Sequence, residues 1–286
     1  MAIILDIYNM KGGVGKTTTA CAFASLLEMC CKKVLLIDMD LQANSTKVFD
    51  AYDETGMSPT VRDLFLSGIP VKEIIKNSGN SNVSVIPSGA NHEETAALVY
   101  QKAAIKEIDD PNTILRERIK EIEDAYDFII IDSSPSVDVV STNFLVISDY
   151  VLSPVQVDGF SYEGLQLVLN RMAYVKTNYN SKLEFLGVLM TQCEIRTTLF
   201  NQLYKQFINE FGDNAIKQPI RKDNIVKESE SMYVPLYRYE KRSKAGNDYI
   251  KAAAEINLIS EEEERKLLEW HGLKKDTFDL KELING

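Results

Sequence analysis

The stretch that decides the fold is Lys11-Gly12-Gly13-Val14-Gly15-Lys16-Thr17-Thr18. An apolar run from Ile3 to Tyr8 precedes it, and apolar residues spaced as on one face of a helix follow it. Glycines between a strand and a helix let backbone N–H groups close around phosphate oxygens. Lys16 would then neutralise the β- and γ-phosphates, and the Thr17 hydroxyl would join a Mg²⁺ shell. The alternative, a surface turn with solvated lysines, does not require the flanking strand and helix.

The loop differs from the strict phosphate-binding pattern GxxxxGK[ST]. The first glycine of that pattern would fall at Met10, and a second lysine, Lys11, precedes the glycine pair. The sequence therefore has the deviant form of the motif, KGGxGK[ST]. We expect a nucleotide's phosphates to contact the whole loop, which comprises Lys11, Gly12, Gly13, Val14, Gly15, Lys16, Thr17 and Thr18.

Carboxylates follow two further apolar runs at the point where each run ends. Asp38 and Asp40 follow Val34 to Ile37, and Asp132 follows Phe128 to Ile131. Open α/β sheets bind ligands at this carboxyl edge. One such carboxylate could simply terminate a strand or cap a helix. Three on the edge that holds a phosphate loop indicate metal binding and water positioning.

Strand-length apolar runs alternate with helical patterns along the chain. This alternation predicts a doubly wound α/β fold, in which a mostly parallel sheet is flanked by helices. The expected strands are Ile3–Tyr8, Val34–Ile37, Val83–Ile86, Phe128–Ile131, Val151–Val155 and Phe185–Met190. The expected later helices are Glu93–Lys106, Thr113–Asp124, Ser136–Ser148, Ser161–Lys176, Thr197–Phe211 and Asp248–Ile259.

The 286 residues favour one large domain, because no linker or repeat divides them. We expect a core that carries the phosphate loop over residues 1–259 and an acidic helical tail over 260–286. Four consecutive glutamates, Glu261 to Glu264, suit the start of that tail helix. Ser136 is the expected N-cap of its helix. The segment from Gln218 to Gly246 shows no regular pattern and is predicted to be irregular.

The composition is that of a soluble globular protein, with 45% hydrophobic and 26% charged residues. The net charge of −10 would repel a polyanion, so any nucleic-acid contact must come from a local patch. The four cysteines have no metal-binding spacing, and no apolar run approaches the roughly 20 residues that span a bilayer. A cytoplasmic protein is expected.

Taken together, these motifs resemble the ParA (Soj-like) branch of the ParA/MinD family of deviant Walker P-loop NTPases. Besides the loop, five segments carry the resemblance. Asp38 to Asn44 is similar to the family's DxDPQGN element, and Asp132 to Pro135 is similar to its DxPP element. Further along the chain, Val151 to Gln156 with Gly164-Leu165 is similar to VxPxQ…GL, Gln192 to Thr197 is similar to YDxRT, and Pro219 to Leu236 is similar to IPRNVRLSEAPSHGKPV. The resemblance covers about residues 1 to 255. Departures include Leu41 and Ala43 for Pro and Gly, Ser133 and Ser134 for Thr and Pro, and Gln192-Cys193-Glu194 for the Tyr-Asp pair.

The resemblance implies a slow, Mg²⁺-dependent ATPase that forms a homodimer around ATP. It implies that Lys11 reaches phosphates in the partner subunit, as an arginine finger does, and that Lys16 and Thr17 bind phosphate and Mg²⁺. The expected catalytic residues are Lys11, Lys16 and Asp40, with Asp40 positioning the attacking water. Further metal-site residues are Asp38 and Asp132, and the adenine contacts implied are Gln192 and Pro219.

A basic segment over residues 216–251 predicts binding to DNA. It holds nine basic and five acidic residues, a local excess of +4 in a chain of −10. Such an excess binds phosphate backbone without reading bases, whereas the alternative is a solvated surface loop. The resemblance favours DNA, because Arg221 and Lys227 match positions where the family carries DNA-contacting arginines. The predicted DNA-binding residues are Arg221, Lys222, Lys227, Lys241, Arg242 and Lys244.

The resemblance also implies a role in partition of a plasmid, integrative element or chromosome. The expected partners are non-specific DNA and a ParB-like centromere-binding protein that stimulates hydrolysis, which would associate the chain with the nucleoid. One alternative is a MinD-like membrane-surface positioning ATPase, although the acidic tail disfavours anionic lipid and no membrane is expected. Another is an ATPase switch for a different cytosolic cargo.

Overall fold

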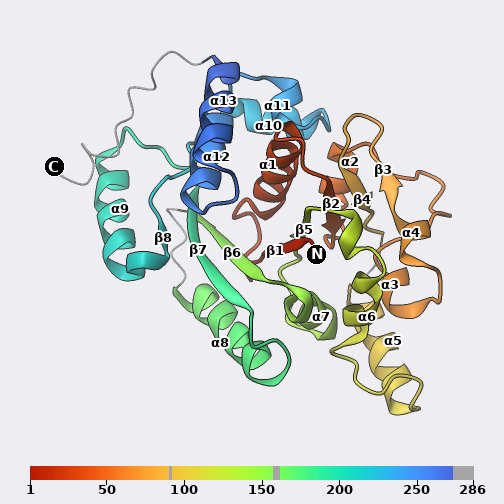
Figure 1. Cartoon of the computed structure of the whole chain (residues 1–286). Coiled ribbons are helices and arrows are strands. Elements are labelled where there is room, and N and C mark those ends of the chain that lie inside the picture. The colour runs from red at the N-terminus through yellow and green to blue at the C-terminus, as the bar shows by residue number, and fades with distance from the viewer. Residues whose placement is uncertain (90–91, 157–161, 273–286) are drawn as a thin grey trace.

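The computed structural model describes residues 1–89, 92–156 and 162–272. The described strands form one sheet in the order β3-β4-β2-β5-β1-β6-β7-β8 (Figure 1). All neighbouring pairs are parallel except β3 and β4. The strands are β1 Ile3–Ile7, β2 Val34–Asp38, β3 Lys76–Asn77, β4 Ser84–Ile86, β5 Phe128–Asp132, β6 Tyr150–Gln156, β7 Glu184–Thr191 and β8 Ala215–Ile216.

Helices cover both faces of this sheet, so the predicted doubly wound α/β class is confirmed. The α-helices are α1 Lys16–Met29, α2 Asn44–Val48, α3 Asp63–Leu66, α4 Val71–Ile74, α5 His92–Ala104, α6 Ile114–Lys120, α7 Val139–Ile147, α8 Tyr162–Asn178, α9 Thr198–Phe211, α10 Asn224–Ser231, α11 Leu236–Tyr239, α12 Lys244–Glu255 and α13 Glu261–His271. Short 3-10 helices, η1 Glu123–Ala125 and η3 Gly212–Asn214, precede β5 and β8.

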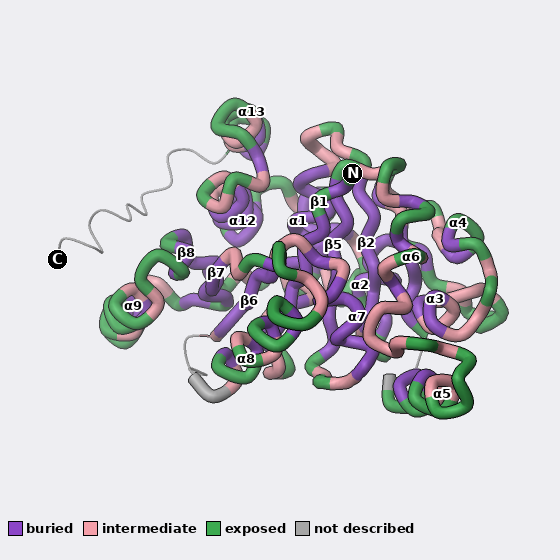
Figure 2. The backbone as a smooth tube through the Cα atoms, turned by 60° about the horizontal axis from the view of Figure 1, so that its bottom comes forward, coloured by how far each residue is buried: buried purple, intermediate pink, exposed green. Residues whose placement is uncertain are grey.

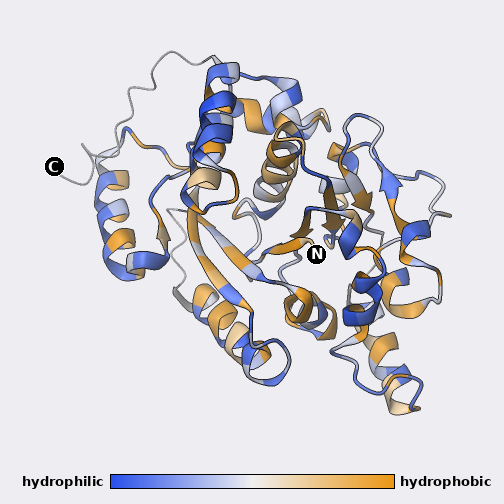
Figure 3. Cartoon of the chain, viewed as in Figure 1, coloured by the Kyte–Doolittle hydropathy of each residue, from blue (hydrophilic) through white to orange (hydrophobic). Residues whose placement is uncertain are grey.

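The central strands are buried on both faces, as Figure 2 shows for β1, β2 and β5. Side chains alternate along each strand: Leu5 and Ile7 pack under α1 and α12, whereas Ile4 packs under α3 to α7. Figure 3 shows the same division, because the strands are mostly apolar and the outer faces of the helices are polar.

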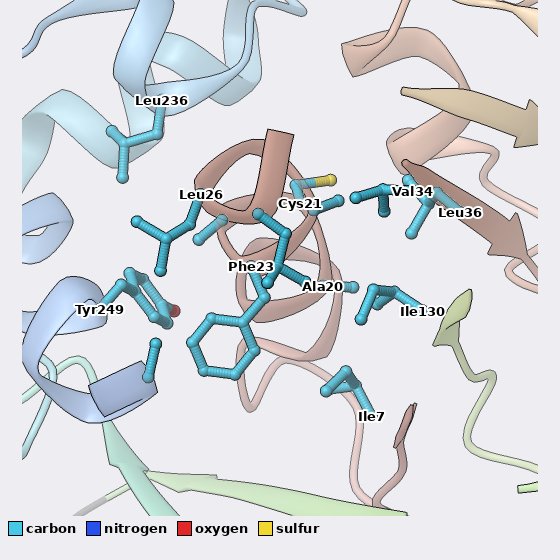
Figure 4. Packing of buried hydrophobic residues seen from close by; sticks show 14 of the residues in the cluster. Ile7, Ala20, Cys21, Phe23, Leu26, Val34, Leu36, Ile130, Leu236 and Tyr249 are labelled. Carbon is cyan, nitrogen blue, oxygen red and sulfur yellow. The ribbon is translucent and has the colours of Figure 1, made fainter. Parts of the chain in front are cut away.

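Helix α1 is largely enclosed. It is buried almost continuously from Thr19 to Leu27, between the sheet and the helices of the C-terminal part. Figure 4 shows Phe23 between the sheet residue Ile7 and Tyr249 of α12. The two rings meet edge to face, with centroids 5.8 Å apart. This packing fixes the helix whose first turn follows the glycine-rich loop.

Several predicted boundaries were wrong for local reasons. Helix α7 is capped by Asp138 and not by Ser136. The Asp138 carboxylate accepts from Ser141 N at 2.9 Å, and the Ser141 hydroxyl accepts from Asp138 N at 3.0 Å. Helix α12 begins at Lys244, four residues before the expected start at Asp248, because Ser243 caps it. The segment expected to be irregular contains α10 and α11.

The start of the predicted C-terminal tail is helical, as expected. Ser260 and Glu263 form a reciprocal capping box at the beginning of α13. Leu267 and His271 of this helix are buried, and Leu267 joins the core cluster of α1 and α12. The rest of the predicted tail, residues 273–286, lies outside the described residues.

Within the described part of the chain, no helix combines the length and the apolar character that a bilayer crossing requires.

Candidate nucleotide and metal site

The glycine-rich loop joins β1 to α1 as the sequence predicted. Gly13 and Gly15 have φ values of +76° and +88°, in the left-handed region that glycine adopts without strain. Gly15 is the N-cap of α1, so no side chain of the cap covers the first N–H groups of the helix. An uncapped helix start with a positive dipole end is suited to an anion such as a phosphate.

Side chains from the neighbouring strands hold the loop carbonyls away from this helix end. Gln156 and Gln192 donate to the carbonyl of Gly13 at 2.7 and 3.1 Å. The Thr191 hydroxyl donates to the carbonyl of Val14 at 2.8 Å. Sequence reasoning singled out Gln192 but missed Thr191, whose only signal was its position at the end of a predicted strand.

Lys16 is buried at the first position of α1. Its ammonium donates to the carbonyl of Lys11 at 2.9 Å, so the two lysines of the motif are linked through the loop. Burial lowers the pKa of Lys16, and the nearby carboxylates of Asp132 and Asp40 oppose that shift. The site therefore places one cation at the base of the loop, opposite several acids.

Asp132 ends β5 beside the loop. Its Oδ1 accepts from the Thr17 hydroxyl at 3.2 Å, while its Oδ2 is buried and has no hydrogen-bond partner among the described residues. Burial raises the pKa of Asp132 well above its usual range, and the carboxylate of Asp38 raises it further. A buried carboxylate oxygen without a partner, next to a threonine hydroxyl, is a donor set that fits a hard cation such as Mg²⁺.

No group of three acidic, histidine or cysteine side chains suited to a metal occurs among the residues that the structure describes. Mg²⁺ at phosphate sites is usually held by one or two protein groups together with phosphates and waters. The Thr17–Asp132 pair is sufficient for that kind of coordination.

Asp38 holds the adjacent loop in shape. Its Oδ1 accepts from Asp40 N at 2.9 Å, and its Oδ2 accepts from the backbone N–H and the hydroxyl of Thr46 at 2.8 and 2.7 Å. Burial raises the pKa of Asp38, and the bonds from Thr46 oppose the shift. Asp38, which was predicted to belong to the metal site, therefore hydrogen-bonds the residues that follow β2 and holds their loop in place.

Asp40 lies in that loop and is partly exposed. Its Oδ1 accepts from Gln42 N at 3.0 Å, and its backbone carbonyl accepts from the Ser88 hydroxyl at 2.5 Å. Ala43 adopts a left-handed conformation with φ +52° at the start of α2. The loop 39–43 therefore presents Asp40 at the same sheet edge as Lys16 and Asp132.

Comparison with known proteins agrees with this geometry. A family model described as an AAA domain matches residues 2–185. The sporulation initiation inhibitor protein Soj of Bacillus subtilis is 32% identical over 256 residues, which are 90% of this chain and 98% of Soj. The chain belongs to the ParA/Soj family. The chromosome partitioning protein ParA of Caulobacter vibrioides is 30% identical over 265 residues, covering 92% of this chain and 96% of ParA.

Solved structures show the same fold. The McdA–ATP complex of Cyanothece superposes with a TM-score of 0.75 at 19% identity, over 91% of this chain and 98% of McdA. ParA/Soj proteins are partition ATPases, and the loop together with Asp38, Asp40 and Asp132 forms the candidate nucleotide site of this chain.

The two residues predicted from ParA/Soj proteins to contact adenine are placed differently. Gln192 lines a small cavity of about 80 Å³ that also touches Gly15 and Ile220. Pro219 does not line it, and its carbonyl accepts from the Gln218 side chain at 2.9 Å. Of the two, Gln192 is therefore the one next to the phosphate loop.

Arg221 does not fit the expected role in DNA binding. Its guanidinium is 9% exposed and bonds both carboxylate oxygens of Asp248, which is fully buried. Arg221 therefore braces α12 from inside the fold and is not available on the surface. Exposed side chains remain at the other predicted positions, which are Lys222, Lys227, Lys241, Arg242 and Lys244.

Asp223 links the starts of α10 and α12. Its Oδ1 caps α10 by accepting from Ile225 N at 3.1 Å, and its Oδ2 accepts from Lys244 N at 2.8 Å at the start of α12. The ends of the two helices therefore meet, and Lys222 and Lys244 flank the junction. We call Lys222, Lys227, Lys241, Arg242 and Lys244 the basic surface. Arg238 is also exposed but pairs with Glu28 at 3.0 Å and is not counted in it.

Proposed function

We propose that this chain is an ATP-dependent partition ATPase that binds DNA non-specifically as an ATP-bound homodimer and leaves DNA after hydrolysis. The supporting observation is the combination of an uncapped helix end, the buried Lys16 and the Thr17–Asp132 pair at one sheet edge. Membership of the ParA/Soj family supports the choice of ATP and of partition as the task.

In this proposal the loop amides and Lys16 bind the β- and γ-phosphates of ATP, and Thr17 with Asp132 holds Mg²⁺. Mg²⁺ supplies charge neutralisation between the phosphates when it is bound. Asp40 orients the attacking water, and Asp38 keeps Asp40 in place through the bond to its backbone N–H. Phosphoryl transfer depends mainly on such placement and charge stabilisation, so a slow hydrolysis by this set is physically reasonable.

Lys11 is the proposed residue that reaches the partner subunit's nucleotide. Its carbonyl accepts from Lys16 and its backbone N–H donates to Asn9 Oδ1 at 3.0 Å, so the backbone is anchored. A cation presented by an anchored backbone can stabilise developing charge across a dimer interface. Dimerisation would then depend on ATP and on this lysine.

The basic surface is the proposed DNA contact. Lys222 lies just before α10, Lys227 on α10, Lys241 and Arg242 in the loop between α11 and α12, and Lys244 at the start of α12. Four of these residues are lysines, which contact phosphate as point charges. Recognition of a particular site would fall to a ParB-like DNA-binding partner that stimulates hydrolysis. A chromosome, as in the name of the Caulobacter ParA, or a plasmid is the proposed cargo.

The proposal is tested by measuring the oligomeric state of the protein in solution with ATP and Mg²⁺. Asp40→Ala should accumulate as a dimer, because water positioning is lost while phosphate contacts remain. Lys11→Ala should stay monomeric, and Lys16→Ala should lose turnover. A monomeric Asp40→Ala protein under saturating ATP, or undiminished turnover in Lys16→Ala, would contradict the assignment.

A further inference from the structure

A carboxylate from α10 reaches the first turn of α1. The Thr18 hydroxyl donates a short hydrogen bond to Glu230 Oε1, although the two residues are 212 positions apart in the sequence. Thr18 lies immediately after Lys16 and Thr17 in the phosphate-binding motif. An acid therefore lies at the helix end where the positive dipole and free N–H groups favour an anion.

Glu230 also lines two cavities beside the loop. The larger, of about 450 Å³, lies between α1, α2 and α10 and touches Thr17 and Asn44. The smaller, of about 80 Å³, touches Gly15 and Gln192. Thr18, Glu230 and Lys227 line both. Only the larger falls within the roughly 300–1,000 Å³ typical of small-molecule sites. The two hydrogen-bonded side chains of Thr18 and Glu230 both line the smaller cavity, next to Gln192.

The same helix is connected to the loop that carries Asp40. Lys47 of α2 donates to the carbonyl of Gln42 at 3.0 Å, and its ammonium lies 5.6 Å from the ring centroid of Tyr233, which follows α10. The ring of Tyr52 lies on the same ammonium at 5.4 Å. Helix α10 is thus held to the site at two points, by Glu230 on α1 and by Lys47 beside Asp40.

We infer that Glu230 is a latch that competes with the nucleotide's phosphates for the start of α1 and transmits nucleotide binding to α10. Phosphate charge at Thr18 repels the carboxylate, which breaks the Thr18–Glu230 bond and opens the cavity next to Gln192. Because α10 has only eight residues, release of Glu230 also shifts Lys227, one turn away on the basic surface. This inference rests on the proposed function and adds a residue that tunes ATP affinity and couples it to the DNA-binding face.

Titration with a fluorescent ATP analogue and Mg²⁺ tests the latch. Glu230→Gln keeps the size of the side chain and removes its charge, and Glu230→Ala removes the contact altogether. Both should bind the nucleotide more tightly, by about five- to tenfold, as expected for a lost like-charge contact that is partly exposed. The matched control is Glu228→Gln, the same charge change on the same helix, at an exposed residue that accepts from the Tyr239 hydroxyl at 3.2 Å.

Hydrogen exchange gives a second readout that does not depend on hydrolysis. In the wild type, addition of ATP should increase exchange of the α10 amides. In Glu230→Ala, exchange should already be high, and ATP should change it little. The latch is overturned if the wild type and both Glu230 variants bind the nucleotide with equal affinity, or if ATP does not change hydrogen exchange in α10 of the wild type. In either case the ATPase assignment stands. If the wild type binds no nucleotide, the proposed function fails with it.

Discussion

Arg221 and Asp248 form a buried, two-pronged ion pair. Arg221 Nε and Nη2 donate to the two carboxylate oxygens at 2.8 and 2.7 Å, and Arg221 N adds a third bond at 2.9 Å. The pair links the segment after β8 to α12. Because Arg221 was expected on the DNA surface, its true position changes which substitutions can test DNA binding.

Arg221→Ala should lower stability by about 3–5 kcal/mol, because it leaves the carboxylate of Asp248 buried without a counter-charge. Equilibrium unfolding in urea measures the change. Lys222→Ala is the control: Lys222 pairs with Glu194 at 2.5 Å, both side chains are exposed, and such a pair contributes at most about 1 kcal/mol. Equal losses in the two variants would show that the buried pair has no special role.

Ala43→Gly should stabilise the chain. Ala43 holds φ +52° and ψ +37°, a left-handed conformation that costs a residue with a Cβ about 1 kcal/mol or more. Glycine removes that cost but adds freedom to the unfolded chain, so the expected gain is about 0.5–1 kcal/mol. Ala97→Gly, at an exposed position inside helix α5, should instead destabilise by about 1 kcal/mol. A loss of stability in Ala43→Gly would contradict the strain.

The buried Asp6 should make stability fall as pH rises. Burial raises the pKa of Asp6 to about 7, although a bond of 2.6 Å from the Ser133 hydroxyl opposes the shift. Because the folded pKa lies above the unfolded one, this group favours the folded state only at low pH, and its contribution is lost between about pH 4 and 7. Asp6→Asn should therefore gain stability relative to the wild type at pH 8 and little at pH 4. If the two proteins differ in free energy of unfolding by the same amount at pH 4 and at pH 8, this prediction is wrong.

His271 should act in the opposite direction. Its ring is fully buried beside Tyr237, neither ring nitrogen has a hydrogen-bond partner among the described residues, and burial lowers its pKa. The unfolded chain binds the proton more readily, so this stabilising contribution is complete above about pH 6.5 and is lost as pH falls. His271→Phe should reduce the loss of stability between pH 7 and 5 by about 1 kcal/mol. The thermal midpoint at the two pH values provides the measurement, and an unchanged pH dependence would be the contrary result.

The sequence predicted those parts of the site that are formed by residues close together in the sequence. The loop from Lys11 to Thr18 and the strand-end acids Asp38 and Asp132 are local patterns, because a strand, a glycine turn and a helix suffice to place them. Their convergence follows from the parallel sheet, in which Asp38 lies opposite Asp132 in register.

Contacts between distant segments could not be predicted in this way. The Thr18–Glu230 bond and the Arg221–Asp248 pair depend on how α10 and α12 return to α1, and no local pattern encodes that return. The basic segment was interpreted from charge alone, which does not separate a buried arginine from exposed lysines. Strands β3 and β8 were missed because each has only two residues, too few to show a local pattern.

The most direct test of the account is binding to unrelated duplex DNA with ATP, with ADP and without nucleotide, each at two salt concentrations. Binding should require ATP and Lys11 and weaken steeply with salt. The Arg242→Ala, Lys244→Ala double variant should bind less tightly with a salt slope reduced by about 2. The Lys72→Ala, Lys182→Ala variant, which loses the same charge elsewhere on the surface, should bind normally. DNA binding that is absent, or that is equal with ADP and ATP, would contradict the account, and vesicle binding would then favour a membrane-surface ATPase.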